Sequence, residues 1–288
     1  MTQRRHASAL LASPVLTGAL LAGALLAGLA GPSAAAELPA AIREAGVLHV
    51  SVNAIYPPME YKDPASGKLT GLDVDLGAAL AQKLGLRIVW AESAFAQLMP
   101  SLQTGRADLI ISGLTDRVSR HEVADFIDYM KTGAQFYVQA ASPAATPADL
   151  CGKRVGTSRS TSFPAEIAAW SKAQCEAAGK PAIEVVNAES TADARGELRQ
   201  GRIDAAVQGS ETIPYAFANE PGTYRALGAP FTTGYQGIAI ARTDPALRDA
   251  VTAALAGLIA DGTYTAILTK YGLQGNAVAA PIVNGAGQ

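Results

Sequence analysis

A ten-residue pattern that occurs twice, 96 positions apart, constrains the fold more than any other feature of the sequence. Residues 102–111 read LQTGRADLII and residues 198–207 read LRQGRIDAAV. Each copy predicts a helix end, a glycine turn and an Asp that opens a buried strand. A common helix-to-strand turn would also give such a match. Yet a predicted strand at 153–157 precedes the second copy by about the distance at which one at 47–52 precedes the first. We therefore predict two similar α/β lobes.

Short strand patterns alternate with helical patterns along the chain, which indicates an α/β fold with crossover helices. In the first lobe we predict strands at 47–52, 86–90 and 107–112, and helices at 73–84 and 96–104. In the second lobe and beyond it, the prediction is a loop at 139–149, a helix at 164–178, strands at 153–157, 183–187, 203–208 and 235–241, and helical structure from 244 to 270.

The first 36 residues have the form of a secretory signal peptide. A short basic head containing Arg4 and Arg5 is followed by an apolar stretch, and Ala34-Ala35-Ala36 gives a small-x-small cleavage motif before Glu37. The stretch is also long enough for a transmembrane anchor. Its mild hydrophobicity and the cleavage motif favour removal of this segment near Ala36. Because there is no Cys near the cleavage site, we do not expect a lipid anchor at the new N-terminus. We expect export to the periplasm.

The charge of the mature chain argues against a nucleic-acid partner. Without Arg4 and Arg5, 21 Lys and Arg remain against 25 Asp and Glu, a net charge of −4 with His neutral. No basic tract or Lys/Arg-rich segment occurs, whereas nucleic-acid binding needs a basic surface.

The two cysteines predict one disulfide. Cys151 and Cys175 are the only cysteines, and they lie 24 residues apart. In an oxidising compartment an even pair of this kind is typical of a disulfide, and the spacing does not suit a metal site or a redox CxxC motif. The chain-entropy model gives such a bridge roughly 3 kcal/mol.

No motif of the sequence predicts catalysis. The mature chain has two histidines, His49 and His121, and neither has the spacing of a metal cluster or of a motif-bound base. The serine-rich run at 156–160 is not a nucleophile elbow, and no Walker or GxGxxG motif follows a strand. We therefore expect no catalytic residues, no metal and no cofactor.

Three polar clusters follow predicted strands, where α/β proteins usually bind ligands. The first, residues 53–60, places Tyr56 in a loop stiffened by two prolines, where it could stack on a ligand or simply pack. The second, Ser112-Gly113-Leu114-Thr115, is followed by Arg120, which could form a bidentate ion pair with a carboxylate. The third, residues 158–162, is rich in hydroxyls that could cap a helix and also accompany a bound anion.

Four motifs together make the chain resemble the periplasmic polar amino-acid binding proteins of ABC transporters, the family-3 solute-binding proteins. They are YPPMEY at 56–61, LTGLDVDL at 69–76, LMPSLQTGRAD at 98–108 and DGTY at 261–264, and the resemblance extends from about residue 46 to 273. It implies a two-lobed Venus-flytrap fold of type II with two hinge crossings, near 131–135 and 230–235. Lobe 1 would comprise 37–131 and 235–288, and lobe 2 would comprise 132–234.

The resemblance also implies a ligand site with residues from both lobes. Arg120 matches the arginine that binds the ligand carboxylate. The remaining matches are Tyr56 and Phe95 as aromatic walls, Ser112, Gly113 and Thr115 as strand-end residues that hydrogen-bond the ligand, and Thr161 and Ser162 as second-lobe contacts to the carboxylate.

Two positions of this site depart from the family pattern. Asn53 stands where some members use an acidic residue to recognise the ligand side chain, which argues against a strongly cationic ligand. Gly209 stands where members usually have the Asp that binds the α-ammonium group. Glu211 could supply that charge from a shifted position, or the ligand could lack an α-amino group.

The resemblance implies reversible binding of a small carboxylate ligand, an amino acid first of all, and delivery to a membrane ABC permease by a monomer. A few proteins with this fold are cyclohexadienyl dehydratases, which act on prephenate or arogenate, so an enzyme is the alternative. In that case Glu211 would be the candidate general acid. A sensory binding domain is a third possibility, but the sequence shows no attached transmembrane or signalling segment that would support it.

Overall fold

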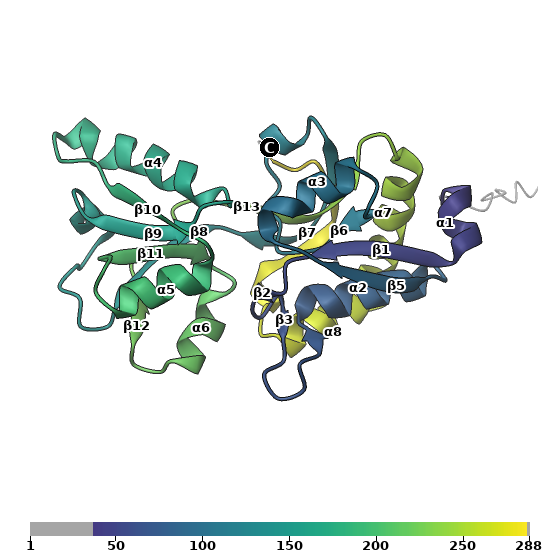
Figure 1. Ribbon diagram of the computed structural model, residues 1–288, viewed down its shortest axis with the longest axis horizontal. Coiled ribbons are helices and arrows are strands. Elements are labelled where there is room, and N and C mark those ends of the chain that lie inside the picture. Colours follow the sequence, from purple (N-terminus) through teal and green to yellow (C-terminus); the bar gives the residue numbers. More distant parts are fainter. Residues whose placement is uncertain (1–36, 287–288) are drawn as a thin grey trace, which may run out of the picture. The chain divides into compact units, whose positions relative to one another are not determined.

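The computed structural model describes residues 37–286, and within them the chain forms two α/β lobes, each built on its own sheet, plus one small sheet. The predicted signal peptide, residues 1–36, lies outside the described residues. Figure 1 shows the two large sheets and the strands that connect them.

Lobe 1 is built on strands β1 (Val47–Val52), β5 (Arg87–Glu92), β6 (Leu109–Ile110), β7 (Ala124–Thr132), β13 (Gly234–Ala241) and β14 (Ala277–Val283). Their order across the sheet is β14-β7-β13-β6-β1-β5. The sheet is mixed, because β1 runs parallel to β5 and β6 whereas β7 is antiparallel to both β13 and β14. The small sheet of lobe 1 consists of β2 (Ile55–Tyr56), β3 (Glu60–Lys62) and β4 (Leu69–Thr70).

Lobe 2 is built on strands β8 (Ala134–Gln139), β9 (Arg154–Ser158), β10 (Glu184–Ala188), β11 (Ala205–Gly209) and β12 (Tyr224–Ala226). Their order is β10-β9-β11-β8-β12, with β9 parallel to β10 and β11 and with β8 antiparallel to β11 and β12. The same core of three parallel strands therefore occurs in both lobes.

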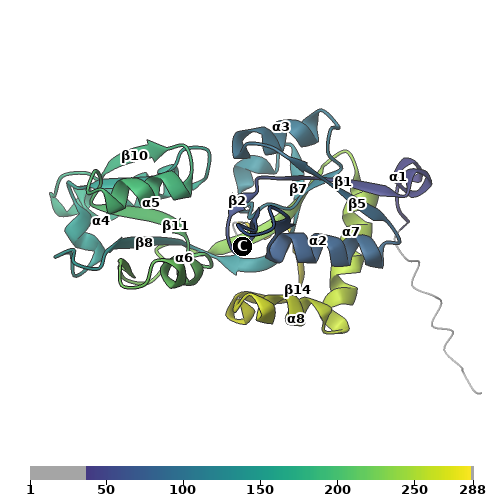
Figure 2. The same cartoon turned by 60° about the horizontal axis from the view of Figure 1, so that its bottom comes forward.

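Helices cover both faces of each large sheet. They are α1 (Ala40–Ala45), α2 (Leu72–Lys83), α3 (Leu98–Gln103), α4 (Phe163–Gln174), α5 (Thr191–Arg199), α6 (Ile213–Asn219), α7 (Pro245–Ala260) and α8 (Thr263–Lys270). Figure 2 shows α3 on one side of the lobe 1 strands and α2, α7 and α8 on the other. Ile127 and Tyr129 of β7 pack in the core beneath α2, α7 and α8, whereas Phe126 packs in the core beneath α3. This alternation follows the two-residue period of a strand.

The repeated sequence pattern has the same structure in both lobes. Gly105 and Gly201 adopt positive φ angles of 68° and 70° at the ends of α3 and α5, where glycine has no steric cost. Asp108 then exchanges hydrogen bonds with His49 of β1, since its carboxylate accepts the His49 N–H at 2.7 Å and its own N–H donates to the His49 carbonyl.

In lobe 2 the second Asp of the pattern makes the same exchange. The Asp204 carboxylate accepts the Arg154 N–H of β9 at 2.9 Å, and the Asp204 N–H donates to the Arg154 carbonyl at 2.8 Å. The predicted similarity of the two lobes is thus explained by a shared device that sets the register of parallel strands.

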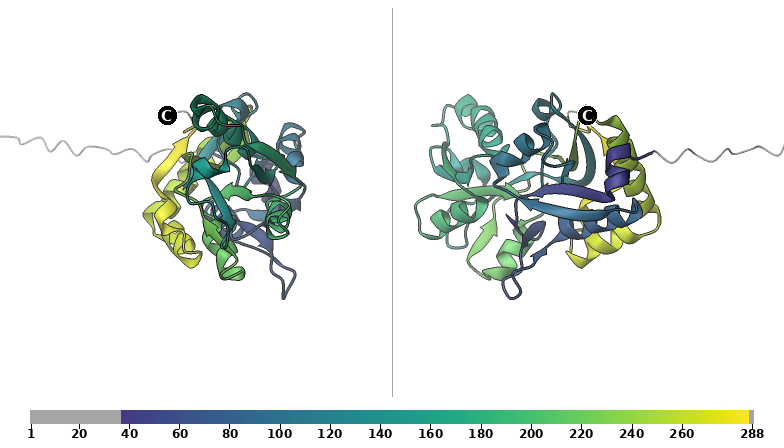
Figure 3. Two further views of the ribbon diagram at one scale, coloured as in Figure 1. Left: turned by 90° about the vertical axis from the view of Figure 1, so that its left-hand side faces the viewer. Right: turned by 45° about the vertical axis from the view of Figure 1, so that its right-hand side comes forward.

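The chain passes between the sheets twice. β7 of lobe 1 ends at Thr132 and β8 of lobe 2 begins at Ala134; the return lies between Ala226 of β12 and Gly234 of β13. After this return, α7, α8 and β14 complete lobe 1. Figure 3 shows the first described elements, in purple, and the last, in yellow, within the same lobe.

Several elements differ from the sequence prediction. The predicted helix at 96–104 begins as a 3-10 turn, Phe95–Gln97, before α3. The helical stretch from 244 to 270 is two helices that meet at 77°, because Gly262 has a φ of 84° and the Asp261 side chain accepts the N–H of Thr263. Strands β7, β8 and β14 were not predicted.

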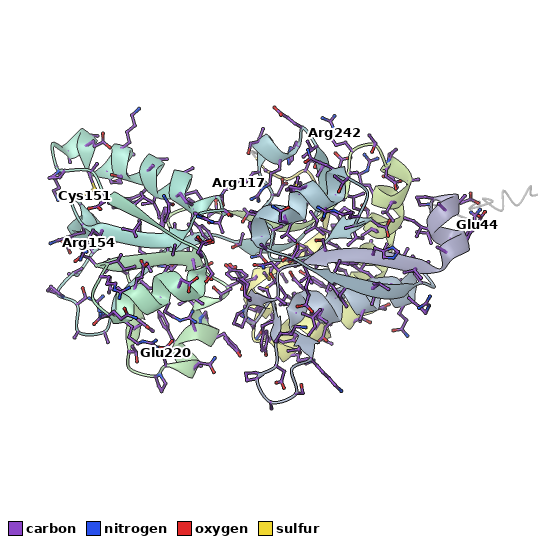
Figure 4. The ribbon with its side chains drawn as sticks, viewed as in Figure 1. Glu44, Arg117, Cys151, Arg154, Glu220 and Arg242 are labelled. Carbon is purple, nitrogen blue, oxygen red and sulfur yellow. A yellow bond between two sulfur atoms is a disulfide. The ribbon has the colours of Figure 1, made fainter. Side chains whose placement is uncertain are left out.

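Cys151 and Cys175 form the predicted disulfide, with Cα atoms 5.5 Å apart, in the part of lobe 2 where Figure 4 labels Cys151 and Arg154.

Within residues 37–286, no single helix is both long and apolar enough to span a membrane; α7 and α8 reach that length and composition only as a bent pair.

Candidate ligand site

A cavity of about 340 Å³ is lined by residues of both lobes. Eight of the predicted site residues line it: Asn53, Tyr56, Phe95, Gly113, Thr115, Arg120, Thr161 and Ser162. The other two, Ser112 and Glu211, are buried behind its walls, with 0% and 2% of their surface exposed. The structure therefore brings together residues that lie more than 100 positions apart in the sequence.

Arg120 supplies a positive charge to the cavity. It ends a short 3-10 turn, Val118–Arg120, and its Nη1 donates to the Thr115 carbonyl at 2.6 Å, which fixes the guanidinium beside the end of β6. Burial, and to a lesser extent the neighbouring Arg117, lowers the pKa of Arg120 to about 10, so that the group remains charged at neutral pH. Among residues 37–286 no carboxylate forms an ion pair with Arg120, and a bound carboxylate would meet a partly buried cation.

The strand-end residues next to Arg120 are already hydrogen-bonded within lobe 1. The Ser112 hydroxyl accepts the Asn53 N–H at 2.9 Å and donates to Glu60 Oε1 at 2.9 Å. The Gly113 N–H donates to Asp73 Oδ2 at 2.6 Å. Ser112 thus supports the cavity wall from behind, and Gly113 has its carbonyl rather than its N–H to offer a ligand.

Gly113 also has a steric role. Its φ is 49°, and a Cβ at this position would lie 2.9 Å from the Tyr56 ring. Only glycine therefore allows the Tyr56 ring to lie against the end of β6.

Two buried carboxyl groups, Glu60 and Asp73, lie beneath this wall. Burial raises the pKa of Glu60 well above its usual value, and the adjacent Asp73 raises it further. Burial likewise raises the pKa of Asp73 to about 6, against the opposing effect of a hydrogen bond from the Tyr129 hydroxyl at 2.7 Å. Both carboxyl groups are therefore harder to ionise than an exposed carboxyl group is.

Tyr56 and Glu211 connect the lobes at the hinge side of the cavity. The Tyr56 hydroxyl donates to Glu211 Oε1 at 3.1 Å and accepts the N–H of Gly209 at 3.1 Å. Gln236 Nε2 also donates to Glu211 Oε1, at 2.8 Å, and Thr132 Oγ1 donates to Oε2 at 2.5 Å. Burial raises the pKa of Glu211, while these donors stabilise its ionised form and oppose the rise.

The hydroxyl-rich segment at 158–162 forms the lobe 2 wall, where it leads into α4. Thr161 Oγ1 donates to the Ser158 carbonyl at 2.7 Å and accepts the Phe163 N–H at 3.3 Å. Ser162 Oγ accepts a hydrogen bond from Arg117 Nη2 at 3.3 Å, so its own proton remains for an acceptor in the cavity. This wall therefore offers the Ser162 hydroxyl proton to an anion.

Sequence reasoning missed another part of the lobe 2 wall. Glu189, Ser190, Thr191 and Asp193 line the cavity where β10 ends and α5 begins, together with Arg159, whose Nη2 lies 2.8 Å from Glu189 Oε2. The rule that ligands bind at the carboxyl ends of strands would have indicated this segment.

The described residues show no arrangement suited to a metal. Within 37–286 no three His, Cys, Asp or Glu side chains are grouped as a metal site requires. The cavity instead combines the guanidinium groups of Arg120 and Arg159, hydroxyls, carboxyl groups and the rings of Tyr56 and Phe95. It can enclose a small polar molecule that carries a carboxylate.

Comparison with known proteins gives the same picture. The chain is 32% identical over 256 residues to the arginine-binding protein ArgT of Corynebacterium glutamicum, covering 88% of this chain and 83% of ArgT. An ancestral arginine-binding protein, solved with arginine and with glutamine, is 30% identical with TM-scores of 0.70 and 0.71, covering 78–79% of this chain and 98% of that one. The ancestral amino acid-binding protein AncCDT-1, a precursor of cyclohexadienyl dehydratase, is 29% identical with a TM-score of 0.71, covering 80% and 97%.

The family match spans both lobes. The profile of the bacterial extracellular solute-binding proteins, family 3, matches residues 48–274, from β1 to the end of α8 and beyond. The resemblance inferred from the four sequence motifs is confirmed. The chain belongs to family 3 of the bacterial extracellular solute-binding proteins.

Proposed function

We propose that this protein binds a free polar α-amino acid between its lobes and delivers it to an ABC permease. The observation that carries the proposal is Arg120, a partly buried guanidinium that lines the cavity with no carboxylate partner in the described chain. Thr115 lies on the same wall, and Thr161 and Ser162 offer hydroxyls from lobe 2. Relatives named for arginine and histidine binding support an amino-acid ligand.

The α-ammonium group is proposed to bind near Glu211 and Tyr56. Gly209 leaves no side chain to receive it, and a Cβ at this position would fall on the Glu211 carboxylate. Glu211 therefore occupies the space from which an Asp at 209 would project. The carbonyl of Gly113, beside the Tyr56 ring, is a further acceptor for the ammonium group.

For the ligand side chain, we propose a neutral polar group. Asn53 lines the cavity, and its Nδ2 donates to the Ser93 carbonyl at 2.7 Å. This bond uses the amide nitrogen and leaves the Asn53 Oδ1 as an uncharged acceptor. An amide such as that of glutamine would be neutral beside Asn53, whereas a guanidinium at this position would meet an uncharged acceptor instead of a carboxylate.

Binding is proposed to be reversible and without chemistry, in the periplasm, after removal of the signal peptide. The dehydratase alternative draws support from the likeness to AncCDT-1 and needs an acid directed into the cavity. Glu211 is engaged by three donors and is 2% exposed, which makes it a poor proton donor to a substrate. Incubation with prephenate should yield no phenylpyruvate; formation of phenylpyruvate would establish the enzyme instead.

The experiment that tests the proposed function is a thermal-shift screen of the mature protein. A ligand that binds only the folded state raises the melting temperature by mass action. We expect shifts with polar α-amino acids, larger with L-glutamine than with L-arginine, and none with the corresponding amines that lack a carboxylate. Shifts that do not require a carboxylate would contradict the proposal.

A further inference from the structure

Arg117 and Glu166 form an ion pair between the lobes, immediately beside the cavity. Arg117 belongs to lobe 1 and lies three residues before Arg120, whereas Glu166 lies in the first turn of α4 in lobe 2. Arg117 Nη2 contacts Glu166 Oε1 and also donates to Ser162 Oγ at 3.3 Å. Figure 4 labels Arg117. One side chain thus joins the segment that carries Arg120 to the wall that carries Ser162.

The Glu166 carboxylate extends this contact to the strands that cross between the lobes. Its Oε2 accepts the Thr232 hydroxyl at 2.8 Å, and Thr232 Oγ1 in turn accepts the N–H of Ala134 at 2.9 Å. Thr232 lies on the return segment and Ala134 begins β8, so both crossings meet the same carboxylate through hydrogen bonds.

The burial of the two partners is unequal. The Glu166 side chain is 9% exposed and that of Arg117 is 32% exposed. A desolvated carboxylate is costly unless it is paired, so loss of Arg117 would leave Glu166 with Thr232 alone. Separation of the lobes would return Glu166 to water. The arrangement in which the lobes enclose the cavity therefore depends on Arg117.

We propose that Arg117 and Glu166 form a latch that holds the lobes around the ligand and presents the Ser162 hydroxyl to its carboxylate. Arg117 is a positioning residue in this proposal, because it acts through Ser162 and through the lobe arrangement without lining the cavity itself. The identity of the ligand in this proposal rests on the proposed function, whereas the ion pair between the lobes does not depend on it.

The test uses Arg117→Ala, Glu166→Gln and the exchanged pair Arg117→Glu/Glu166→Arg in the mature protein. With L-glutamine and L-arginine as probes, we expect Arg117→Ala to weaken binding about tenfold or more, mainly through faster dissociation in stopped-flow fluorescence. Glu166→Gln should have a smaller effect, because it leaves no buried unpaired charge. The exchanged pair should recover part of the affinity.

A matched control is available in lobe 1. Arg248 pairs with Asp125 at 2.9 Å, and the two side chains are 28% and 9% exposed, almost as in the latch. Arg248→Ala should lower the melting temperature and leave affinity and dissociation rate unchanged. An Arg117→Ala variant that binds and dissociates like the wild type, or an exchanged pair that is worse than both single variants, would overturn the latch.

A measurement without ligand separates the latch from the proposed function. Small-angle X-ray scattering should give a larger radius of gyration for Arg117→Ala than for the wild type and for Arg248→Ala. If the wild-type protein binds neither amino acid but this difference is found, the ligand assignment fails and the latch stands. Equal radii in all three proteins would refute the latch even if the amino acids bind.

Discussion

The carboxylate of Glu211 occupies the space into which a side chain at residue 209 would project. A Cβ on Gly209 would fall on the Glu211 carboxyl oxygens, closer than any real contact. A glycine and a glutamate two residues apart thus place a carboxyl group where a side chain at residue 209 would otherwise stand. The shift brings the charge deeper, where Tyr56, Thr132 and Gln236 donate to it.

Replacement of this charge should affect amino acids more than their desamino analogues. Glu211→Gln keeps the shape of the side chain but removes the negative charge that we propose attracts the α-ammonium group from behind the cavity wall. We expect at least tenfold weaker binding of an α-amino acid, as for a charge-assisted hydrogen bond, and little change for its desamino analogue. Isothermal titration calorimetry with both compounds measures the difference.

A second substitution provides the control. Gly209→Asp combined with Glu211→Ala should restore amino-acid binding. The space now filled by the Glu211 carboxyl group is then free for the new Asp side chain, and the φ of residue 209 is not positive. Gly209→Asp alone should destabilise the protein, since both carboxylates would compete for one position. Equal losses for the amino acid and its analogue in Glu211→Gln would exclude an ammonium-binding role.

Stability should fall as the pH rises from about 4 to 8, in part because of Asp128. Burial, and then the neighbouring Asp116, raises the pKa of Asp128 to about 8 in the folded protein. In this window the unfolded chain releases the proton and the folded chain keeps it, so unfolding is favoured by up to about 1.4 kcal/mol per pH unit.

Asp128→Asn tests this statement. An amide cannot ionise, its NH2 group can donate toward the neighbouring Asp116, and its oxygen can still accept the Gly285 N–H that now bonds Asp128 Oδ2. The variant should therefore gain stability relative to the wild type as the pH rises from 5 to 8, in urea unfolding monitored by circular dichroism. A difference that stays constant over this range would show that Asp128 titrates normally.

The disulfide should stabilise lobe 2 without affecting the ligand. Cys151 and Cys175, 24 residues apart in the sequence, enclose a segment that contains β9 and α4, and neither lines the cavity. Cys151→Ser/Cys175→Ser should lower the free energy of unfolding by roughly 3 kcal/mol. Affinity at a temperature where the variant is folded should match the wild type. A large loss of affinity would mean that the bridge positions the 158–162 segment.

The sequence was sufficient to predict the two lobes but not their mixed sheets. The repeat identified the parallel strands because its Asp residues set their register. Strand β7 escaped detection because Asp125 and Asp128 interrupt its apolar pattern. Their burial is explained by Arg248 and Gly285, partners more than 120 residues away that a local pattern cannot reveal.

The same reason limited the prediction of the site. Arg120 and the 158–162 segment were found because each follows a strand end. Ser112 and Gly113 were expected to hydrogen-bond the ligand, but Glu60 and Asp73 engage the Ser112 hydroxyl and the Gly113 N–H, which leaves the Gly113 carbonyl for a ligand. Which donors remain free is decided by contacts between distant segments.

Calorimetry of Arg120→Ala is the most direct test of the central claim, that the two lobes close on a carboxylate held by Arg120. The side chain lines the cavity and makes one hydrogen bond to the Thr115 carbonyl, so its removal should spare the fold. We predict that the wild type binds a polar α-amino acid and that Arg120→Ala shows no measurable heat of binding, while Arg242→Ala, whose Nη1 donates to the His121 carbonyl at 3.0 Å, binds normally. Near-native affinity of Arg120→Ala for the same amino acid would contradict the account.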